Sequence, residues 1–84
     1  MRIAGVRVSP PYARLLAEIV EQAGYVDTAN VLTDAIRLQA IEAPLTIEDH
    51  EAILEALGDN CPSGLARLRR QLLDDQMRRR RAGF

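Results

Sequence analysis

The single histidine, His50, lies in the run Glu48-Asp49-His50-Glu51, where imidazole and carboxylates together suggest a metal site. Helical spacing argues against this, because side chains share one helix face only at steps of three or four residues. Around His50 those positions hold Thr46, Ile47, Ile53 and Leu54. None is a carboxylate, so we predict a solvated or capping histidine, no metal site and no cofactor.

The single cysteine, Cys61, precedes Pro62 near the start of a predicted helix, where the helix dipole can lower a thiol pKa. No histidine lies nearby in sequence, and we interpret Cys61 as a turn residue. One cysteine forbids an internal disulfide and a multi-cysteine zinc site. The sequence shows no Gly-rich phosphate loop and no Ser-His-Asp set. We therefore expect that the chain is not an enzyme.

The basic side chains are all arginines and gather at one end. Residues 1–64 carry four Arg against ten Asp and Glu, a net charge of -6, whereas residues 65–84 carry seven Arg against two Asp, a net charge of +5. The run Arg78, Arg79, Arg80 and Arg81 has two interpretations. It is either a solvated helix end with cations at the negative pole of the dipole, or a contact for nucleic acid or an acidic protein partner.

Length and composition predict one small domain. The 84 residues are 48% hydrophobic, which excludes a disordered chain, but a lone chain of this size buries little core, so we expect a homo-oligomer. No apolar run approaches the roughly 18 residues that span a bilayer. Arg2, Arg7 and Arg14 interrupt the N-terminal stretch where a signal peptide stays apolar. We expect a cytoplasmic protein without a membrane partner.

Periodicity predicts a short strand followed by four helices. Val6 and Val8 alternate with Gly5 and Arg7, as in a strand. Ser9 offers a cap for a helix over about 10–23, which Gly24 ends.

The remaining helices follow from caps and apolar stripes. The second is capped at Asp27 or Thr28, has apolar positions as far as Ile41, and is ended by Pro44. The third begins at a capping box of Thr46 with Asp49 and closes at Gly58; the fourth is capped by Ser63 and lined by Leu65, Leu68, Leu72 and Leu73. We predict a mainly α fold, compact overall, with a first segment at 1–44 and a helical hairpin with an Arg-rich end at 45–84.

The order of strand, cap, helix, Gly turn and second helix resembles the ribbon-helix-helix fold over residues 3–42. Gly24-Tyr25 followed by a helix containing Ala35-Ile36-Arg37 is similar to the turn and second helix of ribbon-helix-helix repressors and ParD-type antitoxins. The resemblance implies a homodimer whose two strands pair into one ribbon. That ribbon would bury Val6 and Val8 and turn Ile3, Gly5 and Arg7 towards the major groove of duplex DNA.

The resemblance also implies roles for particular residues. Arg7, the only polar side chain of the three, would contact guanine bidentately. The amides at the start of the second helix, around Thr28, Ala29 and Asn30, would hold a phosphate. The sequence departs from the family pattern in two ways. It has one polar side chain on the DNA-facing side of the strand, where members usually present two or three, and it places Asp27 where phosphate would approach.

Two functions follow. The first is a small bacterial DNA-binding regulator or antitoxin-like homodimer, in which residues 45–84 contact a toxin-like protein. The alternative is an all-helical interaction or adaptor module that does not bind DNA and captures a protein through its second helix or through Arg78–Arg81.

Overall fold

The N-terminal element of the computed structural model, which describes residues 1–82, is a tight hairpin of two antiparallel strands, β1 (Arg2–Ile3) and β2 (Val6–Arg7). Ala4 and Gly5 form the turn, with φ of 52° and 80°. Two consecutive positive φ values give the type of turn that matches the twist of a two-stranded ribbon. The short N-terminal strand that the sequence predicts is therefore divided into two strands, because Gly5 is a turn residue. Residues 83 and 84, which end the predicted 45–84 segment, lie outside the described residues.

A third piece of chain completes the sheet edge. The Arg2 amide donates to the carbonyl of Ile41 at 2.7 Å, and the Ala43 amide donates to the carbonyl of Arg2 at 3.0 Å. Arg2 thereby forms a parallel bridge with Glu42. β1 lies between β2 and segment 41–43, and both of its edges are hydrogen-bonded within the chain.

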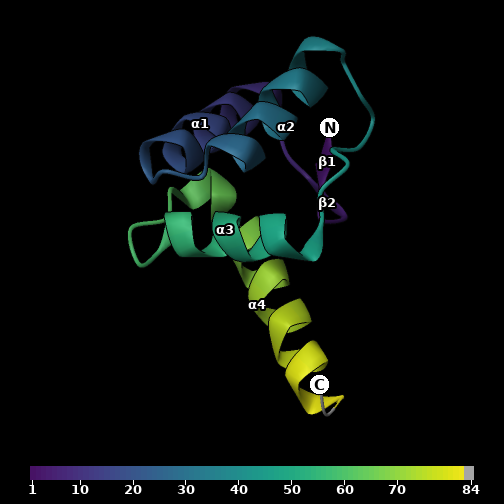
Figure 1. The fold of residues 1–84 in the computed structure, drawn as a ribbon, viewed down its shortest axis with the longest axis vertical. Coiled ribbons are helices and arrows are strands. Elements are labelled where there is room, and N and C mark those ends of the chain that lie inside the picture. Colours follow the sequence, from purple (N-terminus) through teal and green to yellow (C-terminus); the bar gives the residue numbers. More distant parts are fainter. Residues whose placement is uncertain (83–84) are drawn as a thin grey trace.

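Helices α1 (Pro10–Gln22) and α2 (Val26–Arg37) lie side by side (Figure 1). The Gly24 amide donates to the carbonyl of Glu21 at 3.0 Å and the Tyr25 amide to that of Val20 at 3.1 Å. This pair of bonds is the Schellman arrangement, and Gly24 takes its left-handed position with φ of 96°. The predicted end of the first helix is confirmed. Ser9 occupies the N-cap position, but its side chain makes no capping bond.

Helix α2 begins and ends earlier than predicted. It starts at Val26, so neither Asp27 nor Thr28 is its cap, and it stops at Arg37 rather than near Ile41. Gln39 adopts φ of 53°, and the Ala40 amide donates back to the carbonyl of Ala35 at 2.9 Å. The apolar residues beyond the helix, Leu38 and Ile41, are largely exposed, and segment 41–43 bonds to β1 through its backbone.

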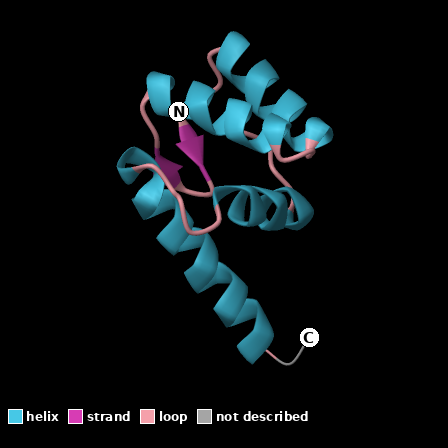
Figure 2. Ribbon diagram, turned by 90° about the vertical axis from the view of Figure 1, so that its left-hand side faces the viewer, coloured by secondary structure: helices cyan, strands magenta, loops and turns pink. Residues whose placement is uncertain are grey.

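Helix α3 (Ile47–Leu57) carries the predicted capping box: the Thr46 side chain accepts from the Asp49 amide, and the Asp49 side chain accepts from the Thr46 amide. A 3₁₀ turn, η1 (Ser63–Leu65), then leads into α4 (Ala66–Arg81). Ser63 lies inside that turn and does not cap α4, which corrects the predicted fourth cap. Helices α3 and α4 cross steeply (Figure 1), and the strands lie beside the first turns of α4 (Figure 2).

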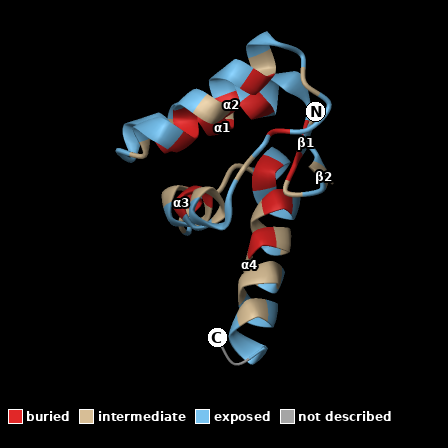
Figure 3. Cartoon of the chain, turned by 45° about the vertical axis from the view of Figure 1, so that its right-hand side comes forward, coloured by how far each residue is buried: buried red, intermediate tan, exposed pale blue. Residues whose placement is uncertain are grey.

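One hydrophobic core joins both predicted segments. Its largest fully buried side chains come from the hairpin and from every helix: Ile3, Leu16, Val20, Leu32, Ile53, Leu65, Leu68 and Leu72. Figure 3 shows the buried positions on the facing sides of α1, α2 and β1 and on the first half of α4. The predicted fold class is confirmed, mainly α with four helices and a short N-terminal two-stranded sheet. Within residues 1–82, no helix combines the length and apolar character that crossing a bilayer requires.

Candidate interaction surfaces

The hairpin divides the three predicted DNA-reading residues. Ile3 has no exposed surface and packs in the core, so the expectation that it points outward is wrong. Gly5 is exposed in the turn, and Arg7 is exposed on β2. Because the register pairs Arg2 with Arg7 and Ile3 with Val6, the hairpin turns two arginines to solvent and two apolar side chains inward.

The hairpin also limits which strand edge could pair with a strand of a second chain. Both edges of β1 are occupied within the chain, by β2 and by segment 41–43. The signal that sequence reasoning missed is Ala4-Gly5, a two-residue turn between apolar residues.

The predicted phosphate contact lies on the first two turns of α2. Thr28 and Ala29 are buried, at 5% and 2% exposure, whereas Asn30 is exposed. The Thr28 hydroxyl donates to an Asp49 carboxylate oxygen at 2.6 Å, which ties α2 to the start of α3. A phosphate approaching this site would meet the carboxylates of Asp27 and Asp49.

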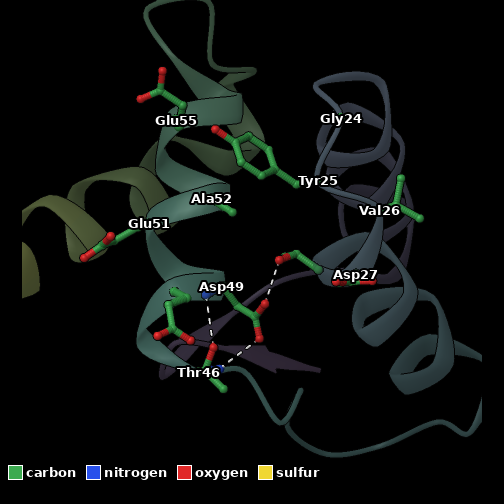
Figure 4. Close-up of a pocket in the computed structure, with 11 residues that line it drawn as sticks. Gly24, Tyr25, Val26, Asp27, Thr46, Asp49, Glu51, Ala52 and Glu55 are labelled. Atoms are coloured by element: carbon green, nitrogen blue, oxygen red, sulfur yellow. Dashed lines mark hydrogen bonds between the residues drawn. The ribbon is translucent and has the colours of Figure 1, made fainter.

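A shallow hollow of about 690 Å³ lies between the start of α2 and α3 (Figure 4). Its carboxylates are Asp27, Glu48, Asp49, Glu51 and Glu55. In Figure 4 the Asp49 side chain turns towards α2, whereas that of Glu51 points away from it. No group of three or more His, Cys, Asp or Glu residues that could hold a metal ion occurs among the described residues.

Burial and hydrogen bonding both act on the carboxylate of Asp49 in this hollow. Burial raises its pKa, but the hydrogen bonds from Thr28 and Thr46 outweigh burial and hold the pKa below its ordinary value. Asp49 is therefore ionised at neutral pH and fully used in joining the two helices.

The cysteine side chain has the opposite shift. Burial raises the pKa of the Cys61 thiol, and the nearby Arg69 guanidinium offsets only part of this. The thiol donates to the carbonyl of Pro62 at 3.4 Å. A protonated thiol is a poor nucleophile.

The second half of α4 leaves the rest of the molecule (Figures 1 and 3). Leu72 is its last buried residue, and we call residues 73–82 the arm and residues 1–72 the body. Arg78, Arg79, Arg80 and Arg81 form the arginine tip of this arm. An Arg78 guanidinium nitrogen lies 3.1 Å from an Asp75 carboxylate oxygen, and in residues 1–82 the other three tip arginines form no ion pair.

Comparison with protein-family models, with curated proteins and with solved structures gave no match to this chain. The ribbon-helix-helix resemblance therefore stays a prediction.

Proposed function

We propose that this protein is a non-enzymatic interaction module of the cytoplasm that holds an acidic macromolecule with the arginine tip. One observation carries the proposal: the tip stands beyond Leu72, the last buried residue, and three of its four arginines pair with no carboxylate in the described chain. Arginine is the side chain best suited to bind carboxylate or phosphate in a two-point contact.

The negative body does not cancel this charge. From Leu72 the helix runs six residues to Arg78 and nine to Arg81, lengths of about 9 and about 14 Å at 1.5 Å per residue. Exposed charges separated by more than about 8 Å are largely screened at physiological salt. The tip therefore presents its own positive field to a partner, although the whole chain has a net charge of -1.

The test compares a variant of the tip with one of the body. Four Arg→Gln changes at Arg78, Arg79, Arg80 and Arg81 remove the tip charge; the same changes at Arg2, Arg7, Arg14 and Arg37, all exposed, lower the net charge equally. Fluorescence anisotropy with a duplex DNA probe and with a poly-glutamate probe measures binding. We expect the first variant to lose binding and the second to retain it. Equal losses, or no binding of either probe by the unmodified protein, would contradict the proposal.

A second candidate function is the DNA-binding homodimeric regulator. It is favoured by Arg2 and Arg7, which occupy paired, exposed positions on the two strands of the hairpin. In that case Arg7→Ala weakens binding to one particular DNA sequence and leaves binding to a scrambled duplex unchanged. Unchanged affinity for every sequence would remove Arg7 from the site.

A further inference from the structure

We infer that the acidic macromolecule is duplex DNA, and that the arginine tip enters the major groove and binds phosphates on both of its walls without reading the bases. This inference rests on the proposed function of the tip and names its partner.

The placement of the tip arginines around the helix favours a groove. Four consecutive residues of an α-helix follow one another at steps of about 100°, so Arg78 to Arg81 cover some 300° of the circumference. A helix lying on a flat protein surface uses one face, made by residues three or four apart. A helix with positive charge on all sides can be neutralised only by anions that lie on both sides of it. The two rows of phosphates that flank a DNA groove are arranged in this way.

The composition of the tip points the same way. Met77, which is 52% exposed, is the only large apolar side chain of the arm beyond Leu73. An amphipathic helix that docks in a protein groove needs apolar anchors at steps of three and four residues. The arm lacks that stripe, so its contact with a partner is electrostatic.

The width of the arm helix favours the major groove of B-form DNA over that of double-stranded RNA. An α-helix with side chains is about 10–12 Å across, and the major groove of B-form DNA is about 12 Å wide. The major groove of double-stranded RNA is too narrow and deep for side chains to read. The projection of the arm lets it enter a groove while the acidic body stays outside.

Asp75 modulates the contact from within the arm. Its carboxylate accepts from Arg78 at 3.1 Å and from the Gln71 amide at 3.1 Å. Arg78 therefore exchanges an internal partner for a phosphate when DNA binds, whereas the other tip arginines are ready to bind.

The first measurement is the affinity of the full chain for a 20-base-pair duplex between 50 and 200 mM salt. Four phosphate contacts predict a slope of log K against log salt of about -3.6, a loss of about 150-fold over this range; three contacts predict about -2.7 and about 40-fold. A scrambled duplex is expected to give the same affinity and the same slope.

Single Arg→Gln variants at each tip position test the groove. We expect each to reduce the slope by about 0.9, because each arginine binds its own phosphate. Asp75→Asn is expected to tighten binding several-fold, because it releases Arg78 and removes one negative charge from the arm. Arg67→Gln, at an exposed position of α4 within the body, serves as the matched control and leaves the slope unchanged.

The outcomes separate the two proposals. Tighter binding to poly-glutamate than to DNA at equal salt would overturn this inference and leave the proposed function standing. Effects confined to Arg78 and Arg81, which share a face, or equal binding to double-stranded RNA would overturn the groove. If the four-arginine variant binds DNA as well as the unmodified protein does, the proposed function fails as well.

Discussion

Leu68 and Met77 lie nine residues apart on the same helix, yet Leu68 is 1% exposed and Met77 is 52% exposed. The body is held by one core to which each helix contributes, whereas the arm is held by its own helical hydrogen bonds, one ion pair and the hydrogen bond from Gln71 to Asp75. No arm residue is buried. Substitutions in the body should therefore change stability most, whereas substitutions in the arm should act mainly on binding.

The largest expected effect contrasts the two parts of α4. Leu68→Ala removes a buried side chain and should lower the free energy of unfolding by about 2–5 kcal/mol. Met77→Ala, on the arm, should change it by less than about 0.5 kcal/mol. Urea denaturation of both variants measures the contrast. Similar losses would show that the arm packs against something in solution.

A smaller effect contrasts two aspartates. Asp49→Asn weakens the capping box and the bond from Thr28, at a cost of about 1 kcal/mol near pH 7. Asp75→Asn removes only an exposed ion pair and a surface hydrogen bond, and should cost less than about 0.5 kcal/mol.

The pH dependence of Asp49 has a definite sign. Its pKa is lower in the folded than in the unfolded state, so its stabilisation is present above the unfolded pKa and is lost as pH falls through the folded pKa. The stability difference between the unmodified protein and Asp49→Asn should shrink as pH falls below about 4. A difference that stays constant down to pH 2 would contradict this assignment.

The last contrast is in the sign of the change in the free energy of unfolding. Gln39 holds φ of 53°, so Gln39→Gly relieves left-handed strain and should stabilise the protein by about 0.5–1 kcal/mol. The same substitution at Gln76, inside the arm helix, should destabilise it by about 1 kcal/mol if the arm is helical in solution. Thermal unfolding of the two variants gives both signs. Stabilisation by both changes would mean that the arm is not helical.

Local signals predicted some helix ends correctly, but the caps expected at Asp27 or Thr28 and at Ser63 were wrong. Gly24 ended α1, and Thr46 with Asp49 began α3, because each device acts within a few neighbouring residues. The end of α2 was missed because Leu38 and Ile41 continue the apolar pattern although both side chains are largely exposed, and because the backbone of segment 41–43 bonds to β1. That pairing depends on residues about 40 positions apart, which periodicity cannot detect.

For the candidate sites too, local sequence patterns were predictable and long-range packing was not. The arginine tip was visible as a run of charge, but its projection from the body depends on where the buried leucines of α4 stop. Alternation assigns residues to one of the two faces of a strand but does not say which face is buried, because the rest of the fold decides that. Ile3 was therefore wrongly predicted to point outward.

The place of β1 between β2 and segment 41–43 bears on how the chain folds during synthesis. The Arg2 backbone finds its last partners on Ile41 and Ala43, about 40 residues later. At about 5–20 residues per second, a ribosome needs roughly 2–8 seconds to add that stretch. β1 is thus synthesised early, but the hydrogen bonds on its second edge form late. Until then, a neighbouring nascent chain can form the same hydrogen bonds with that edge of β1.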